Sequence, residues 1–98
     1  NVYTLRKNST MSIKDLIIEH YGDHSDEGPL LAAGFDDALI GIDPNSLRAV
    51  YSRNKCIDIL VEEGESVEDA IDFLEYNTFN TYVGEYTPIF IEDFQWDT

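Results

Sequence analysis

The chain has 98 residues, a length that fits one domain. Its residues are 43% hydrophobic and 12% aromatic, and this composition argues against disorder despite a formal net charge of −14. The longest apolar run, residues 30–35, is far shorter than the roughly 20 residues that span a bilayer, and Arg6 and Lys7 precede a polar stretch, so we expect neither a membrane span nor a secretory signal. The single Cys56 cannot form an internal disulfide, and we therefore expect a protein of the cytoplasm.

The first predicted helix follows a polar lead. Residues 1–11 are interpreted as a flexible lead, and residues 12–98 as the domain. Ser12 and Asp15 have the spacing of a capping box, and apolar residues follow them at helical spacing, so we expect a helix over residues 13–21. The glycine that comes next and the polar stretch after it have the composition of a loop.

A β-hairpin is expected in the middle of the chain. Residues 38–43 and 48–51 flank a turn-forming sequence at residues 44–46, and the second flanking segment ends in residues that favour a strand. An alternative remains open for the first segment, because residues 36–40 could also begin a short helix with Asp36 as its N-cap.

Two further helices are predicted, joined by a link of one or two residues. The earlier helix begins near Asn54 and stops before Gly64, and the later one follows a second capping box at residues 66–69. The apolar residues at helical spacing are Cys56, Ile57, Leu60 and Val61 in the earlier helix and Val67, Ala70, Ile71 and Leu74 in the later one. So short a link predicts a helical hairpin or a sharp corner.

The last predicted element is a strand over residues 86–91, which follows Gly84. Pro88 lacks a backbone donor, and this suits an edge position or the start of a strand. We expect this strand to join the hairpin. The resulting order is α-β-β-α-α-β, which predicts a small α+β domain with a short antiparallel sheet packed by helices and an acidic-aromatic tail at residues 92–98.

Several segments of the chain together carry a resemblance to a known family. These segments are residues 36–41 (DDALIG), 55–64 (KCIDILVEEG), 68–73 (EDAIDF), 76–77 (YN) and 82–91 (YVGEYTPIFI). They resemble a family of short uncharacterised proteins found in phages and bacteria. The resemblance covers residues 36–91, implies a phage or bacterial origin, and implies no catalytic residue.

Charge is distributed unevenly along the chain. Twelve acidic side chains lie between Asp58 and Asp97, whereas no basic residue follows Lys55. A surface of this sign repels nucleic acid and anionic membranes and attracts cationic surfaces, and added salt weakens the attraction. The charge therefore predicts a basic protein surface as partner, and no direct binding of nucleic acid or membrane.

The acidic residues of the two later helices form two predicted ridges. Glu68, Asp72 and Glu75 are spaced at i, i+4 and i+7, so they share one helical face. The members of the second ridge are Asp58, Glu62 and Glu63. Such ridges could imitate the phosphates of a nucleic-acid backbone, or they could be ordinary solvated faces. Because solvated helices normally mix the two signs of charge, the missing lysines favour a binding role.

The predicted tail mixes acids with large aromatic residues. Phe94 and Trp96 could insert into a groove of a partner while the neighbouring carboxylates meet a basic rim. Alternatively, the two rings fold back over the core of the domain itself. We include both residues among the predicted partner-binding residues.

Signals for metal binding and catalysis are weak. Residues 23–28 resemble the first half of a calcium loop, but the later glutamate ligand is missing and only weak calcium binding remains open. His20 and His24 are four residues apart, yet a glycine between them interrupts the helix. Cys56 lies on an apolar stripe and is interpreted as a core residue. We therefore predict no cofactor, no metal and no catalytic residue.

The functional expectation is a non-enzymatic acidic protein of phage or prophage type. It would dock on a basic, nucleic-acid-binding surface of a host protein, as a mimic or an inhibitor. The alternative is an assembly module that forms a homo-oligomer and uses its charge for solubility.

Overall fold

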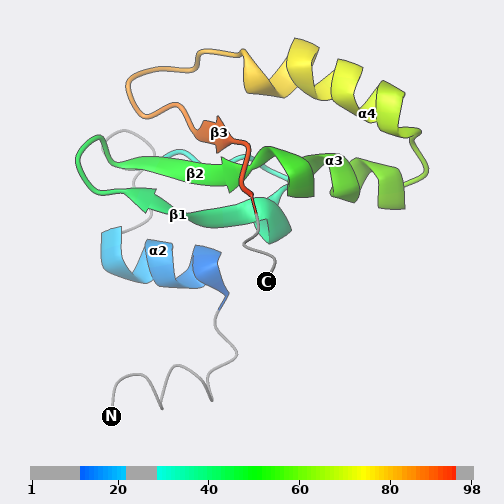
Figure 1. The fold of residues 1–98 in the computed structure, drawn as a ribbon. Helices are drawn as coiled ribbons and strands as arrows, with labels where there is room; N and C mark the ends of the chain where they lie inside the picture. The colour runs from blue at the N-terminus through cyan, green and yellow to red at the C-terminus, as the bar shows by residue number, and fades with distance from the viewer. Residues whose placement is uncertain (1–11, 22–28, 95–98) are drawn as a thin grey trace.

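A computed structural model describes residues 12–21 and 29–94 (Figure 1). The elements in chain order are α2 (Ile13–Tyr21), η1 (Asp36–Ala38), β1 (Leu39–Asp43), β2 (Arg48–Ser52), α3 (Arg53–Glu62), α4 (Val67–Leu74), η2 (Glu75–Phe79) and β3 (Ile89–Ile91). Here η1 is one turn of 3-10 helix and η2 is a π-helical turn. The predicted α+β class and the order of its main elements are confirmed, and residues 1–11, 22–28 and 95–98 lie outside the described part of the chain.

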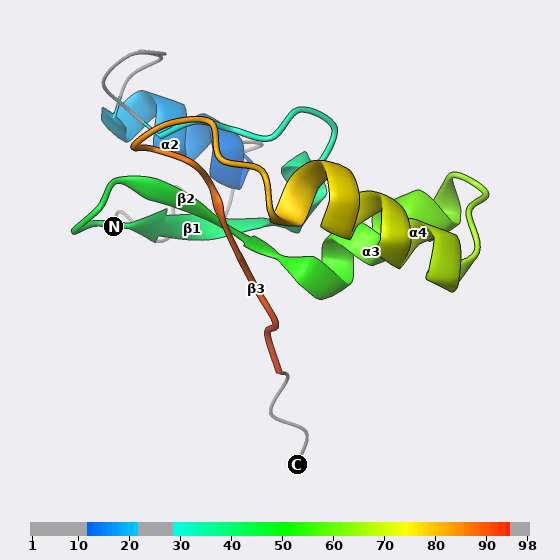
Figure 2. The same cartoon turned by 90° about the horizontal axis from the view of Figure 1, so that it is seen from above.

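The three strands form one mixed sheet in the order β1-β2-β3. β1 and β2 pair antiparallel, as expected of the hairpin, but β3 pairs parallel to β2. The prediction of an antiparallel sheet was therefore wrong for β3. Residues 53–88 leave the end of β2 as two helices and return along the sheet, so the chain enters β3 in the direction of β2 (Figure 2).

The last strand is also shorter than predicted, because it begins at Ile89 and not at residue 86. The backbone N–H of Thr87 donates to the carbonyl of Gly84 at 3.2 Å, and the Thr87 hydroxyl donates to the same carbonyl at 2.6 Å. Thr87 is therefore held in a turn and cannot pair with β2. Pro88 stands immediately before the strand, which is one of the two positions expected for it.

Asp43 closes the predicted hairpin. Its carboxylate accepts from the backbone N–H of Asn45 at 3.1 Å and from the hydroxyl of Ser46 at 2.9 Å. These two donors hold the pKa of the carboxyl below its ordinary value of 3.8. Leu47 completes the turn with a left-handed φ of 58°. The alternative for residues 36–40 is realised in part, since η1 precedes β1.

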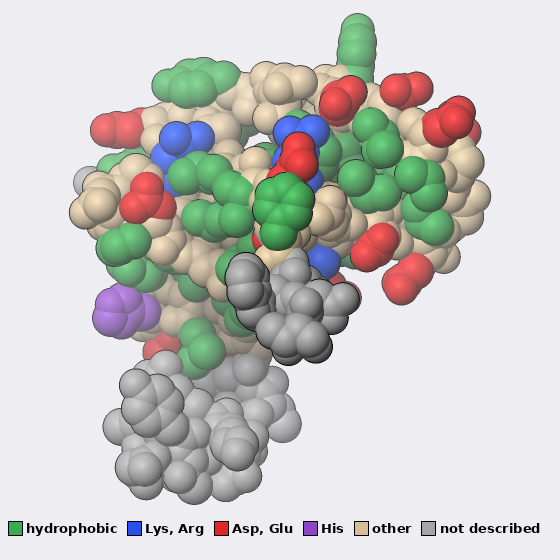
Figure 3. Space-filling model, in the orientation of Figure 1, with side chains coloured by type: hydrophobic (Ala, Val, Ile, Leu, Met, Phe, Trp, Pro, Cys, Tyr) green, Lys and Arg blue, Asp and Glu red, His purple; other side chains and the backbone are tan. Residues whose placement is uncertain are grey.

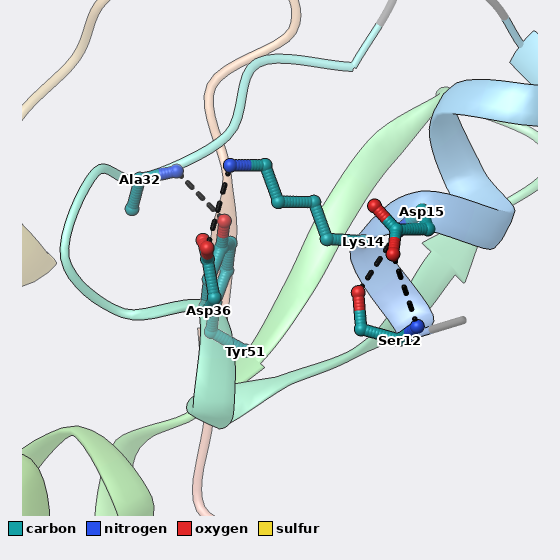
Figure 4. Close-up of polar contacts among 6 residues, drawn as sticks. All are labelled: Ser12, Lys14, Asp15, Ala32, Asp36 and Tyr51. Carbon is teal, nitrogen blue, oxygen red and sulfur yellow. Dashed lines mark hydrogen bonds and ion pairs between the residues drawn. The ribbon is translucent and has the colours of Figure 1, made fainter. Parts of the chain in front are cut away.

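The predicted helix starts are confirmed by their caps. In α2 the Ser12 hydroxyl accepts from the N–H of Asp15 and the Asp15 carboxylate accepts from the N–H of Ser12, each at 3.2 Å (Figure 4). Ser66 caps α4 by accepting from the N–H of Asp69 at 3.1 Å. Between α3 and α4, Gly64 adopts a φ of +111°, which only glycine adopts readily.

Tyr51 lies at the centre of the core. Its side chain is fully buried, its ring stacks on Phe90 with centroids 5.3 Å apart, and its hydroxyl accepts from the N–H of Ala32 at 2.7 Å (Figure 4). Burial raises the pKa of this phenol. The contact ties the loop before η1 to the middle strand. Ile17 joins the same core from α2, as do Cys56 and Leu74 from the other two helices.

Candidate functional site

Helices α3 and α4 form a pair beyond the end of the sheet (Figures 1 and 2). α3 follows β2 without a loop, because Ser52 is both the last strand residue and the N-cap of the helix. Residues 63–66 link the two helices, so they run antiparallel as the predicted helical hairpin. One side of each helix packs inward through Cys56, Ala70 and Leu74, and the other sides face solvent.

Most of the predicted acidic residues lie exposed on this pair. Asp58 and Glu62 are exposed on α3, and Glu68 and Asp72 are exposed on α4. The space-filling view shows acidic side chains along both outer edges of the pair, with apolar side chains between them (Figure 3). On this face, acidic side chains therefore border an apolar surface on two sides.

Glu75 has a different environment from the other acids of its ridge. Its carboxylate lies 3.6 Å from the guanidinium of Arg53, which also stacks at 4.3 Å over the ring of Phe79. Arg53 thus offsets the charge of Glu75 and joins the start of α3 to the π-helical turn after α4. The spacing of the acids could not predict the ion pair of Arg53 and Glu75, because the two residues are 22 positions apart in the sequence and only the fold brings them together.

Glu63 is the C-cap of α3 and lies beside a hollow in the surface. Together with Glu62 it lines this hollow of about 530 Å³, whose other acidic walls are Asp36 and Asp37. Sequence reasoning missed these two aspartates as neighbours, since only the fold brings η1 against α3. Lys14 of α2 lies 3.3 Å from the carboxylate of Asp36 and offsets part of this charge (Figure 4).

Two of the acids oppose the dipole of their own helix. Glu62 is the last residue of α3 and Glu63 is its C-cap, next to carbonyl groups that carry partial negative charge, and the last turn holds no basic residue. Glu68 and Asp69, by contrast, lie in the first turn of α4, where the dipole favours them. Helix stability therefore accounts for Glu68 and Asp69 but not for Glu62 and Glu63.

Basic side chains in the described part of the chain are mostly committed to internal contacts. The guanidinium Nε of Arg48 donates to the carbonyl of Thr87 at 2.6 Å and fastens the segment before β3 to β2. Arg53 and Lys14 form the ion pairs described above. Lys55 lies exposed near the start of α3, far along the helix from Glu62. The free end of the helix pair is therefore uniformly acidic, from Glu62 to Asp69.

The start of the acidic-aromatic tail is anchored, but its first aromatic ring is not. The carboxylate of Asp93 accepts from the hydroxyl of Ser52 at 2.5 Å, and its carbonyl accepts from the side chain of Asn54 at 3.1 Å. Phe94 nevertheless has 88% of its surface exposed, so it does not fold back over the core. Trp96 lies outside the described residues.

The described residues hold no group of His, Cys, Asp and Glu side chains arranged to bind a metal ion. Cys56 is buried, as predicted, and burial raises the pKa of its thiol to about 12. His20 is exposed and packs edge-on against the ring of Tyr21, with centroids 4.7 Å apart. His24 and the candidate calcium loop at residues 23–28 lie in the part of the chain that is not described.

A second, smaller pocket of about 200 Å³ lies between the loop before η1, the π-helical turn and the segment before β3. Its walls are mainly apolar and include Leu31, Val83 and Phe90. The nearby hydroxyl of Thr87 is already used, since it accepts from the N–H of Val83 and donates to a carbonyl. Asn77, Thr78 and Thr81 also line the pocket, and the side chains of Asn77 and Thr81 donate to backbone carbonyls. Few polar groups are therefore free to orient a ligand.

No protein-family model, curated protein or solved structure matches this chain. Among the described helices, none is long and apolar enough to cross a membrane. The acidic surface of α3 and α4 is the feature on which a functional proposal can be built.

Proposed function

We propose that this protein is a non-enzymatic binding protein of the cytoplasm that docks through α3 and α4 on a basic surface of another protein. The observation that carries the proposal is the uniformly acidic end of the helix pair, where Glu62 and Glu63 oppose the dipole of α3. Each such placement costs roughly 0.3–1 kcal/mol, and a cationic partner would remove that cost. Basic surfaces of this kind occur on proteins that bind nucleic acid.

We further propose that the protein is of phage or prophage type. A small acidic phage protein that covers a nucleic-acid-binding surface of a host protein would block access to that surface. Charge complementarity also speeds encounter with such a partner, and salt weakens it. The exposed ring of Phe94 is available to add apolar contact at the rim.

Two charge-matched variants test the proposal. In one, Asp58, Glu62, Glu68 and Asp72 are replaced by the corresponding amides. In the other, the same replacement is made at Asp15, Glu19, Glu85 and Glu92, which are also exposed and lie outside the hollow. Both variants have the same net charge, so any difference between them reports the position of the charge.

The immobilised wild type and both variants are incubated with nuclease-treated bacterial lysate at about 50 mM and about 500 mM salt, and bound proteins are identified by mass spectrometry. We expect a nucleic-acid-binding protein on the wild type and on the control variant at low salt, with loss at high salt and displacement by a short DNA duplex. Equal loss in both variants would show unspecific charge binding, and recovery of this chain alone would support the assembly module.

A further inference from the structure

An apolar strip runs along the α3–α4 pair between its acidic edges. Residues four apart share a helical face, so Ile57 and Val61 lie together on α3, and Val67 and Ile71 lie together on α4. Val67 has 54% of its surface exposed, and the other three side chains are half-buried, with Ile57 also packed against the core. We call these four residues the apolar strip.

Each residue of the strip is followed directly by an acidic residue. The four dipeptides are Ile57-Asp58, Val61-Glu62, Val67-Glu68 and Ile71-Asp72. One step along a helix turns the side chain by about 100°. Because α3 and α4 run in opposite directions, the same step leads to opposite outer edges of the pair. The repeated dipeptide therefore produces one apolar strip with an acidic border on both sides.

We infer that the apolar strip and its two acidic borders bind a cationic amphipathic helix of a partner protein. This inference rests on the proposed function and specifies the part of the partner that is bound. A matching helix has apolar residues along its middle and Lys or Arg on both flanks, so its charges meet both borders while its apolar face covers the strip. The 10 residues of α3 span about 15 Å, which corresponds to about three turns of the bound helix.

Charge argues against the other occupants of this face. A second copy of this chain would bring its own acidic borders against those of the first, and such like-charge contacts are unfavourable. A nucleic acid would be repelled for the same reason, and it offers no apolar face for Val67.

Two peptides of equal composition test the inference. Both contain about 14 Leu and Lys residues, which is long enough to cover the strip. In the first peptide the Leu residues lie on one helical face, and in the second their order is shuffled so that no apolar face forms. Binding of each labelled peptide is measured by fluorescence anisotropy. We expect the wild-type protein to bind the amphipathic peptide at least about tenfold more tightly than the shuffled one.

Two variants of α4 form a matched pair for the same assay. Val67→Gln removes an apolar side chain of the strip that is 54% exposed, and Phe73→Gln removes one that is 50% exposed. Phe73 lies two positions after Ile71, which turns it to the opposite side of α4. We expect Val67→Gln to weaken binding of the amphipathic peptide about fivefold and Phe73→Gln to leave it unchanged. Circular dichroism confirms that both variants remain folded.

The outcomes separate this inference from the proposed function. Equal affinity for both peptides, or equal effects of Val67→Gln and Phe73→Gln, would overturn the strip as a binding surface and leave docking on a basic surface intact. Lack of binding to either peptide would also overturn the inference, and the capture experiment would then decide the proposed function alone. If sedimentation finds a wild-type dimer that Val67→Gln dissociates, a second copy occupies the strip and the inference is wrong.

Discussion

Replacing Ser52 by alanine should destabilise the protein far more than the loss of a simple helix cap. Ser52 is fully buried, and its hydroxyl has two roles. It accepts from the N–H of Lys55, which caps α3, and it donates to the carboxylate of Asp93, which fixes the chain after β3. One hydroxyl thus connects the end of the middle strand, the start of α3 and the segment that follows the edge strand.

The expected loss of stability in Ser52→Ala follows from these two hydrogen bonds. Loss of an N-cap costs about 1 kcal/mol, and loss of a hydrogen bond to a charged group costs about 1.5–3 kcal/mol. Because Asp93 is only half-buried, its carboxylate can regain water, so we take the lower part of this range. The free energy of unfolding should fall by about 2–3 kcal/mol, which lowers Tm by about 10–20 °C in a domain of this size.

Ser66→Ala is the matched control, because Ser66 caps α4 through the N–H of Asp69 and is exposed. Its loss should cost about 1 kcal/mol. Both variants are compared with the wild type by urea unfolding, followed by circular dichroism at the helix signal. Equal destabilisation by Ser52→Ala and Ser66→Ala would refute the reasoning, since the contact with Asp93 would then contribute nothing.

Three further predictions concern single side chains. Tyr51→Phe keeps the ring that stacks on Phe90 but leaves the N–H of Ala32 without its acceptor, so the free energy of unfolding in urea should fall by about 1–3 kcal/mol, and an unchanged value would contradict the role of this hydrogen bond. The thiol of Cys56 should react with a disulfide reagent only as fast as the protein unfolds, and rapid labelling of the native protein would contradict its burial. Burial raises the pKa of this thiol to about 12, so above pH 9 the thiol ionises in the unfolded chain but not in the folded one. The free energy of unfolding should therefore decline above pH 9. Because the pKa of Asp43 is lowered in the folded protein, its carboxylate stabilises the fold above pH 3.8, and this contribution is lost as the pH falls through the folded-state pKa. Asp43→Asn should therefore make Tm decrease less between neutral and acidic pH. Parallel Tm profiles of the variant and the wild type would contradict this prediction.

Local features of the fold were predictable because their causes are local. Ser12 and Ser66 predict helix starts, because the hydroxyl of an N-cap serine accepts from the N–H three residues later. The structure confirms both caps. The same reasoning could not anticipate that β3 runs parallel to β2. Strand direction depends on where α3 and α4 return the chain, and no short stretch of sequence encodes that path.

The candidate site was likewise predictable only in part. The exposure of Glu68 and Asp72 follows from helical spacing, and it is confirmed. The pairing of Glu75 with Arg53 depends on the packing of α4 against α3, and so no periodicity within one helix could indicate it. Helical spacing could not indicate the apolar strip, because it places Ile57, Val61, Val67 and Ile71 in the same patterns as the buried Cys56, Ala70 and Leu74. Only the packing of the two helices decides how far each side chain is exposed.

The parallel pairing of β3 has a consequence for the folding order of the chain. Val50 pairs with Ile89, so this contact closes a long loop, whereas the hairpin and the helix pair each form from residues close in sequence. Contacts of large sequence separation carry the greatest closure entropy and tend to form late. β3 should therefore be the last strand to dock and the first to detach. Amide hydrogens of the segment that holds β3 are expected to exchange with solvent before those that join β1 to β2.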